Sequence, residues 1–213
     1  MTNLLKMGTG GAEIELSMVF ADVRGSTTIG ERLRPADFSA LLSRFYRLAA
    51  DAITGHDGIL DKFVGDEAIG LFIPAFTGEA HAVRAIAAGR ALLAAVAADD
   101  ASPSGPIPVG AGVHTGVAYV GTFGSSEETS LFTALGDPVN TTARLASLAR
   151  AGELLVSAAA ADRADLVTDG LERRSVEVRG RAQGLDVYAI AVTPVDADAA
   201  TRATTMDPGE TPV

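Results

Sequence analysis

The sequence contains no cysteine. This excludes a disulfide framework, a thiolate nucleophile and a cysteine-ligated zinc site, and it fits a cytoplasmic protein. Basic residues are also few: the chain has 17 Lys and Arg and 27 Asp and Glu, which gives a net charge of −10. Nucleic acids and acidic membranes select basic surfaces, so neither is expected as a partner.

Long apolar runs are lacking as well. Residues 1–11 have no apolar core of a signal peptide, and their only basic residue is Lys6. The most apolar helical stretch, Ala85 to Ala98, is interrupted by Arg90 and is too short to span a bilayer. We therefore expect a soluble, cytoplasmic chain with no membrane insertion.

What the sequence does contain is enough apolar material for one packed domain. Its 213 residues are 47% hydrophobic, which suits a single domain of ordinary size. The glycine cluster before residue 12 is followed by no Gly-Lys-Ser/Thr pattern, so residues 1–12 are expected to be a flexible lead-in. We expect a globular domain over 13–193 and a disordered acidic tail over 194–213.

The periodicity of apolar residues predicts alternating strands and helices. Alternation predicts a strand over 14–22, and the i, i+3, i+4 rhythm predicts helices over 35–56 and 79–98. Two hairpins are predicted, one over 58–73 with Gly65 at its turn and one over 109–123 turning at Thr115-Gly116. A strand at 154–156, a helix at 158–164 and strands at 173–178 and 186–192 complete the pattern. It indicates an α+β fold with a ferredoxin-like βαββαβ core elaborated at its C-terminus.

Polar residues interrupt this pattern in three stretches. Asp22 ends the first strand in Phe-Ala-Asp-Val-Arg-Gly-Ser-Thr-Thr, and Lys62 and Asp66 flank the first hairpin turn in Asp-Lys-Phe-Val-Gly-Asp-Glu. Carboxylates from different strands can converge on a hard divalent cation. Taken alone, Asp22 is better interpreted as a strand-end or turn acid, and Asp66 as a residue that serves the hairpin turn.

The third stretch, Phe-Thr-Ala-Leu-Gly-Asp-Pro-Val-Asn-Thr-Thr-Ala-Arg-Leu, begins at Phe132. Asp137 followed by Pro138 predicts a helix start with Asp137 as N-cap. Asn140 and Arg144 then lie one turn apart near a helix N-terminus, which suits phosphate. Arg144 alone indicates no function, because an arginine at a helix surface is common.

Together, the three stretches resemble the signature of the class III nucleotidyl cyclases, over about residues 15–192. The resemblance implies that Asp22, Val23 and Asp66 form the metal site. It implies that Lys62 and Thr133 read the purine, and that Thr133 places the chain in a Thr-type base-binding subclass. The further roles that it implies are ribose orientation by Asn140, contact with the α-phosphate by Arg144 and contact with the terminal phosphates by Arg179, where family members often carry Lys.

The implied reaction is attack of the 3′-hydroxyl of ATP on its own α-phosphate, giving cyclic AMP and pyrophosphate. The resemblance further implies two Mg²⁺ or Mn²⁺ ions per active site and a homodimer whose sites lie between subunits. Lys62 as donor and Thr133 as acceptor suit adenine, whose N1 accepts and whose N6 donates, better than guanine.

Two other functions stay open at this stage. One is a guanylate cyclase, which Lys62 disfavours. The other is a catalytically silent nucleotide-binding or dimerising regulatory module, which the presence of both metal acids, Asn140 and Arg144 disfavours. A diguanylate cyclase would show a Gly-Gly-Asp/Glu-Glu-Phe loop at the hairpin, and Val-Gly-Asp-Glu-Ala lacks it.

Overall fold

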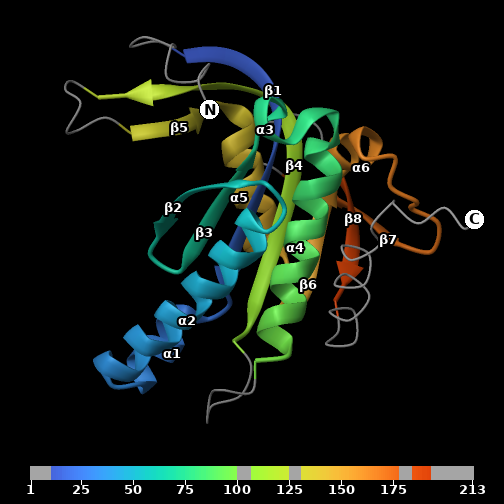
Figure 1. Ribbon diagram of the computed structural model, residues 1–213. Helices are drawn as coiled ribbons and strands as arrows, with labels where there is room; N and C mark the ends of the chain where they lie inside the picture. The colour runs from blue at the N-terminus through green and yellow to red at the C-terminus, as the bar shows by residue number, and fades with distance from the viewer. Residues whose placement is uncertain (1–10, 100–106, 125–130, 178–183, 193–213) are drawn as a thin grey trace, which may run out of the picture.

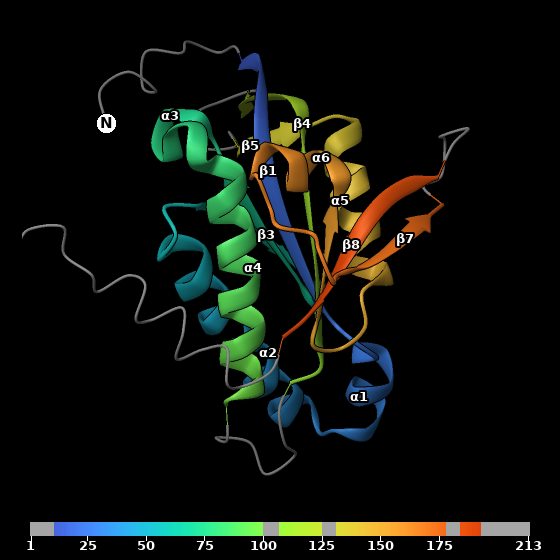
Figure 2. The ribbon, with the colours of Figure 1, turned by 90° about the vertical axis from the view of Figure 1, so that its right-hand side faces the viewer.

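The computed structural model describes residues 11–99, 107–124, 131–177 and 184–192. They form a mixed sheet with helices on both faces (Figures 1 and 2). The strands are β1 (Gly11–Val23), β2 (Ile59–Val64), β3 (Glu67–Phe72), β4 (Val109–Phe123), β5 (Leu131–Leu135), β6 (Glu153–Ser157), β7 (Glu172–Val176) and β8 (Leu185–Ala191). The helices are α1 (Ser26–Arg32), α2 (Pro35–Thr54), α3 (Pro74–Thr77), the 3-10 turn η2 (Gly78–Ala80), α4 (His81–Ala97), α5 (Asp137–Leu148) and α6 (Ala158–Arg163).

The strand order confirms the predicted core. The sheet runs β2-β3-β1-β4-β6-β8-β7, with β5 paired to β4. Its first four strands with α2 and α4 are a βαββαβ unit in which β1 and β3 lie between β4 and β2, and every pair in it is antiparallel. The parallel pairing of β4 with β6, followed by α6, β7 and β8, is the C-terminal elaboration.

Alternating side chains of the central strands fill two cores. Val19, Ala21 and Val23 face α2, α4 and α6, whereas Leu16, Met18 and Phe20 belong to a second cluster with residues of α5. Figure 2 shows α2 and α4 on one side of the sheet and α5 on the other. Asp22 continues the even-numbered series, so its side chain starts from the face that α5 covers.

Helix α2 begins and ends close to its predicted limits. Pro35 occupies its first turn, where a missing N–H costs nothing, and the Arg34 guanidinium donates two hydrogen bonds to the Asp37 carboxylate beside it. Phe45, Ala49, Ala52 and Ile53 form its buried stripe. The helix ends at Thr54, two residues before the predicted end.

The predicted second hairpin within 109–123 is wrong. These residues form one strand, β4, which pairs with β1 from Val109–Val23 to Gly121–Gly11 without a turn at Thr115-Gly116. Its glycines accommodate α5 instead, since a Cβ on Gly112 would lie 2.5 Å from the Ala146 nitrogen and one on Gly116 2.8 Å from Pro138 Cγ. Strand β4 instead pairs antiparallel with β5, the next described strand along the chain.

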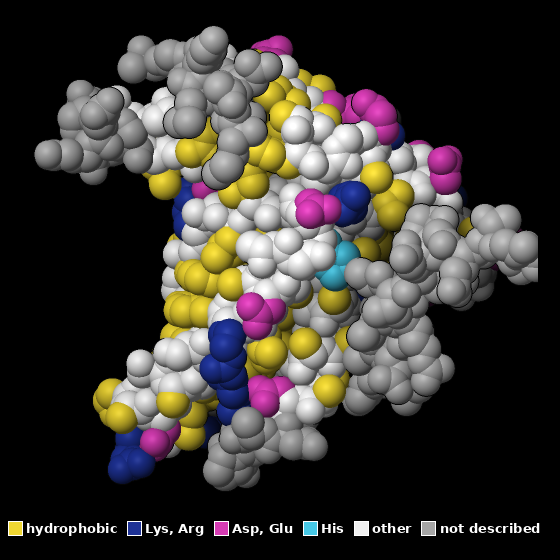
Figure 3. Space-filling model, viewed as in Figure 1, with side chains coloured by type: hydrophobic (Ala, Val, Ile, Leu, Met, Phe, Trp, Pro, Cys, Tyr) yellow, Lys and Arg dark blue, Asp and Glu magenta, His cyan; other side chains and the backbone are white. Residues whose placement is uncertain are grey.

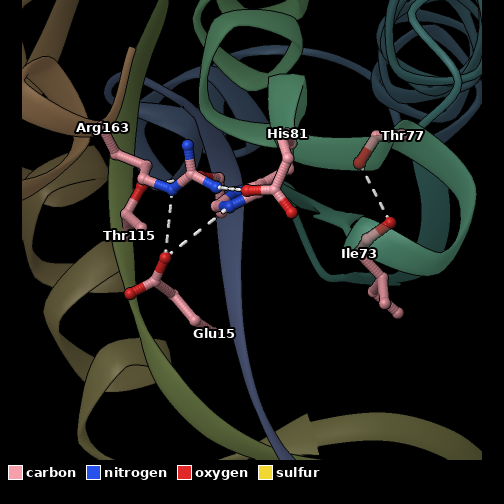
Figure 4. Close-up of polar contacts among 8 residues, drawn as sticks. Glu15, Ile73, Thr77, His81, Thr115 and Arg163 are labelled. Carbon is pink, nitrogen blue, oxygen red and sulfur yellow. Dashed lines mark hydrogen bonds and ion pairs between the residues drawn. The ribbon is translucent and has the colours of Figure 1, made fainter. Parts of the chain in front are cut away.

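A polar network that is buried at Ser17, His81 and Thr115 lies toward the end of β1 away from Asp22 (Figure 4). Ser17 Oγ lies 2.9 Å from His81 Nδ1 and 2.6 Å from Thr115 Oγ1. Glu15 lies 3.8 Å from His81 Nε2 and accepts a hydrogen bond from Arg163. Burial and the nearby Arg163 lower the pKa of His81, which sequence reasoning left without a role.

Among the described residues, one helical run, Pro74–Ala97, is long and apolar enough to cross a membrane by length and composition. It exceeds the expected stretch because α3 and η2 extend α4 toward the N-terminus. Just over half of its apolar window, 56%, is buried inside the domain. Its buried face packs on the sheet and on α2, as the core helix of a folded domain does.

Candidate active site

The tip of the β2–β3 hairpin is a two-residue turn made by Gly65 and Asp66. Val64 pairs with Glu67, and Gly65 has a φ of 60°, which suits the first central residue of a type II′ turn. The Tyr46 hydroxyl of α2 donates to the Gly65 carbonyl, and the Tyr46 ring stacks on Phe63 with centroids 4.1 Å apart. Helix α2 therefore holds the tip in place.

This turn brings Asp66 to Asp22, as predicted. The Val23 N–H donates to the Asp66 carbonyl over 3.2 Å, and Asp22 stands opposite Glu67 across β1 and β3. Burial raises the pKa of Asp22, the ion pair with Arg24 opposes that rise, and interaction with the Asp66 carboxyl adds to it. Two carboxyl groups thus share one partly buried position.

Arg24 and Glu67 complete this acidic group. Arg24 Nη2 lies 2.6 Å from Asp22 Oδ2, and its Nη1 donates over 2.8 Å to the Ser147 carbonyl at the end of α5. Burial, followed by the charges of Asp22 and Asp66, raises the pKa of Glu67 to about 7. The carboxyls of Asp22, Asp66 and Glu67 therefore repel one another beside a single guanidinium, and a bound cation would relieve that repulsion.

Val23 can contribute to such a site only through its carbonyl. Its side chain is buried in the core that faces α2 and α4. The Arg24 N–H donates to Pro108 on the β4 side, so the Val23 carbonyl, which points the opposite way along the sheet, faces the hairpin. Carboxylates and a carbonyl are the hard oxygen ligands that Mg²⁺ and Mn²⁺ take.

A second polar group lies on β2 at Asp61 and Lys62, before the hairpin tip. Lys62 Nζ donates to Thr133 Oγ1 over 2.9 Å, so the two predicted base-reading side chains meet although β2 and β5 are far apart in sequence. Thr133 Oγ1 donates in turn to Asp61 Oδ2 over 2.8 Å, and Lys62 Nζ lies 3.2 Å from the same oxygen. Figure 1 shows β5 and β2 on the same side of the molecule.

Asn140 and Arg144 are exposed on α5, one turn apart as predicted. The predicted cap is wrong: Gly136, with a φ of 135°, is the N-cap, and Asp137 is the first helical residue. Within the described part of the chain, neither Asn140 nor Arg144 makes a side-chain hydrogen bond or ion pair with the acidic group or with Lys62. Arg179 lies outside the described residues.

Comparison with known proteins decides the family. The sequence model described as the adenylate and guanylate cyclase catalytic domain matches residues 12–191. The chain belongs to this family. The family assignment and the fold thus agree with the resemblance carried by the three polar stretches.

Relatives and solved structures agree with this assignment. An uncharacterized protein of Mycobacterium tuberculosis is 36% identical over 158 residues, which are 73% of this chain, and adenylate cyclase 1 of Rhizobium meliloti is 29% identical over 182 residues, or 83%. The matched region covers only 28% and 27% of the length of those two proteins.

Among crystal structures, the guanylyl cyclase Cya2 has a TM-score of 0.77 at 28% identity, covering 86% of this chain and 95% of that one. The adenylyl cyclase CyaB from P. aeruginosa has a TM-score of 0.73 at 27% identity, covering 84% and 94%. Because both an adenylyl and a guanylyl cyclase match, the comparisons identify a nucleotidyl cyclase domain. They do not distinguish ATP from GTP as its substrate.

Sequence reasoning missed several residues that shape the cyclase site. Asp61, Arg24 and Glu67 were given no role, although each adjoins a residue that was. An acid next to Lys62 was visible in the sequence, but alternation along a strand would point it to the opposite face. In the described ranges, no group of three or more His, Cys, Asp or Glu is arranged to hold a metal ion.

Proposed function

We propose that this cyclase domain converts ATP to 3′,5′-cyclic AMP and pyrophosphate. The observation that carries the choice of ATP is the hydrogen bond from Lys62 to Thr133. It leaves an ammonium donor beside a hydroxyl acceptor, and adenine offers the complementary pair, an acceptor at N1 and donors on N6. Guanine offers the reverse order and meets a mismatch at both positions.

The acidic group supports a metal-assisted reaction. Asp22 and Asp66, with the carbonyl of Val23, supply oxygen ligands for Mg²⁺ or Mn²⁺, two ions per site, and substrate phosphates supply the rest. When bound, such ions stabilise the attacking and leaving oxygens of a phosphoryl transfer. The chain's own task is to orient: Asn140 positions the ribose and Arg144 offers charge to the α-phosphate. Arg179 is proposed to contact the terminal phosphates.

We further propose that the active unit is a homodimer. Asp66 interacts with Asp22, whereas Lys62, four residues earlier, contacts Thr133 and Asp61. One chain therefore carries a metal-binding half, with Asp22 and Asp66, and a base-reading half, with Lys62 and Thr133. Among the described residues, no side-chain hydrogen bond or ion pair connects the two halves. A two-fold dimer completes two equivalent sites, each taking one half from each subunit.

Exposed apolar side chains support this partner. Tyr119, Leu131 and Leu135, on β4 and β5, are each more than 40% exposed, and Val64 beside the hairpin tip is 54% exposed. Figure 3 shows apolar side chains gathered over β5 and the β2–β3 hairpin. This surface borders the Lys62–Thr133 pair, so a second copy placed on it would cover the base-reading half.

The test is product formation by the purified chain from ATP and from GTP, with Mn²⁺ or Mg²⁺, for the wild type, Asp22→Ala and Lys62→Ala. Each variant alone is expected to lose activity with ATP. In an equal mixture, half of the dimers are heterodimers with one intact site of two, so activity should return to about a quarter of the wild-type value.

Each other outcome has a distinct meaning. No recovery on mixing would contradict sites shared between subunits, while leaving the reaction itself in place. Preference of the wild type for GTP would identify a guanylate cyclase. The absence of any cyclic product from a confirmed dimer would favour a catalytically silent nucleotide-binding module.

A further inference from the structure

The contact between Lys62 and Thr133 includes a third side chain, that of Asp61. The side chain of Asp61 is almost completely buried, with 3% exposed, while the side chain of Lys62 is 31% exposed. Asp61 Oδ2 accepts the Thr133 hydroxyl and lies beside the Lys62 ammonium. Asp61 Oδ1 is also buried and has no hydrogen-bond partner in the described part of the chain. A buried carboxylate satisfied on one oxygen costs stability, so its presence calls for an explanation other than packing.

A β-bulge explains how two neighbouring residues reach the same hydroxyl. Leu60 pairs with Gly70 and Lys62 pairs with Ile69, so the register of β2 against β3 shifts across Asp61. In a regular strand, Asp61 and Lys62 would point to opposite faces of the sheet. A bulge redirects side chains locally, and here both reach Thr133.

The hydrogen-bond inventory then has one solution. A carboxylate only accepts and an ammonium only donates, so Thr133 gives its proton to Asp61 and accepts one from Lys62. Thr133 keeps one free lone pair, and Lys62 keeps one free N–H. A base therefore meets one donor and one acceptor in a fixed order.

We infer that Asp61 is a specificity-determining positioning residue: by fixing the Thr133 hydroxyl as an acceptor, it makes the Lys62–Thr133 pair select adenine over guanine. This inference rests on the proposed conversion of ATP and deepens it. Without Asp61, the hydroxyl is free to rotate and to donate to guanine O6, which removes one of the two mismatches. Asp61 acts through Thr133, not by touching the base.

The test is a double-mutant cycle read as a selectivity ratio, kcat/KM for ATP divided by kcat/KM for GTP. Asp61→Leu, similar in size but without an acceptor, should lower this ratio about tenfold, the usual effect of one polar contact. In a Thr133→Val background the same change should alter the ratio less than about twofold, because no hydroxyl remains to be oriented. Asp61→Asn, which keeps an acceptor oxygen, should retain most of the selectivity.

A control is Asp186→Asn, because Asp186 of β8 also pairs with a basic residue, Arg173 of β7, but its side chain is 40% exposed. It should leave the ratio unchanged. A merely structural role for Asp61 would lower the melting temperature and both kcat/KM values together without moving their ratio, and that result would overturn the inference. So would an equal effect of Asp61→Leu with and without the Thr133 hydroxyl.

Dissociation constants for ATP and GTP, measured on the same proteins by calorimetry with Mn²⁺, separate the two levels of proposal. If the wild type binds ATP more tightly than GTP but forms no cyclic product, the proposed reaction fails, while the ratio of dissociation constants still tests Asp61. If the wild type forms cyclic AMP selectively and Asp61→Leu leaves the selectivity intact, only the role of Asp61 fails. Preference of the wild type for GTP would overturn both.

Discussion

Glu67 is a single residue whose environment makes the stability of the domain depend on pH. Its pKa rises from the ordinary 4.5 to about 7, because burial and the charges of Asp22 and Asp66 disfavour the anion. Between these two values the folded chain keeps a proton that the unfolded chain has released. The free energy of unfolding therefore falls as pH rises through this window, in the absence of a bound cation.

The matched variant is Glu67→Gln, which keeps the size of the side chain and cannot ionise. From pH 5 to pH 8 the metal-free wild type should lose on the order of 1 kcal/mol more stability than the variant, a figure reduced for solvent screening of a half-buried group. Urea unfolding at both pH values measures this difference. Parallel pH profiles for the two proteins would show that Glu67 does not retain its proton.

At the scale of single residues, the sequence predicted which site residues lie together better than it predicted the neighbouring residues that contact them. Asp22 with Asp66 and Lys62 with Thr133 were expected to act together, and both pairs are in contact. Asp61 was missed because a shift in strand register decides where its side chain points, and no local pattern reveals that shift. The functional roles of these residues, and those of Asn140, Arg144 and Arg179, stay predictions.

At the scale of secondary-structure elements, the close packing of α5 on β4 fixes where Asn140 and Arg144 lie. A Cβ on Gly112 would come within 2.6 Å of Leu145 Cβ and 2.5 Å of the Ala146 nitrogen, neither of which is a flexible chain end. Gly112→Ala should therefore push α5 from the sheet and lower the free energy of unfolding by about 2–3 kcal/mol. Denaturant unfolding measures the loss of stability. Cyclase activity measures whether displacement of α5, which carries Asn140 and Arg144, impairs the proposed reaction.

Gly30→Ala is the control for this prediction. A Cβ there would meet only the Phe38 ring at 3.6 Å, an ordinary contact, within helix α1. That variant should be as stable as the wild type or more stable by about 0.5 kcal/mol, since alanine favours a helix. Equal stability of the two variants would mean that α5 adapts freely, contrary to its tight packing.

The one large error of prediction also belongs to this scale. Thr115-Gly116, flanked by apolar residues, has the composition of a hairpin turn, yet β4 passes through it as an unbroken strand. The pairing of β4 with β1 along the whole strand outweighs the turn propensity of Thr115-Gly116, and Gly116 accommodates the Pro138 ring. Local composition does not reveal that a helix distant in sequence, α5, packs against these glycines.

At the scale of the whole molecule, the exposed apolar surface on β4 and β5 should control assembly. Leu131 is 47% exposed and would be buried against a second copy, so Leu131→Glu should place a charge in the interface. Sedimentation should show a dissociation constant raised at least about tenfold, with activity recovering at high protein concentration. Val167→Glu, at a residue 77% exposed between α6 and β7, should leave assembly unchanged. A dimer unaffected by Leu131→Glu would rule out this surface.

The long pairing of β1 with β4 also determines the order in which the domain can form. Val23 pairs with Val109 and Gly11 with Gly121, so the strand made first stays without its longer neighbour until the rest of the core has been synthesised. Contacts so distant in sequence slow folding, because a large loop must close before they contribute. Until β4 is synthesised, β1 can pair with β3 along one edge and pack against α2 and α4 on one face, but its other edge has no partner strand, and an unpaired edge favours aggregation of the nascent domain.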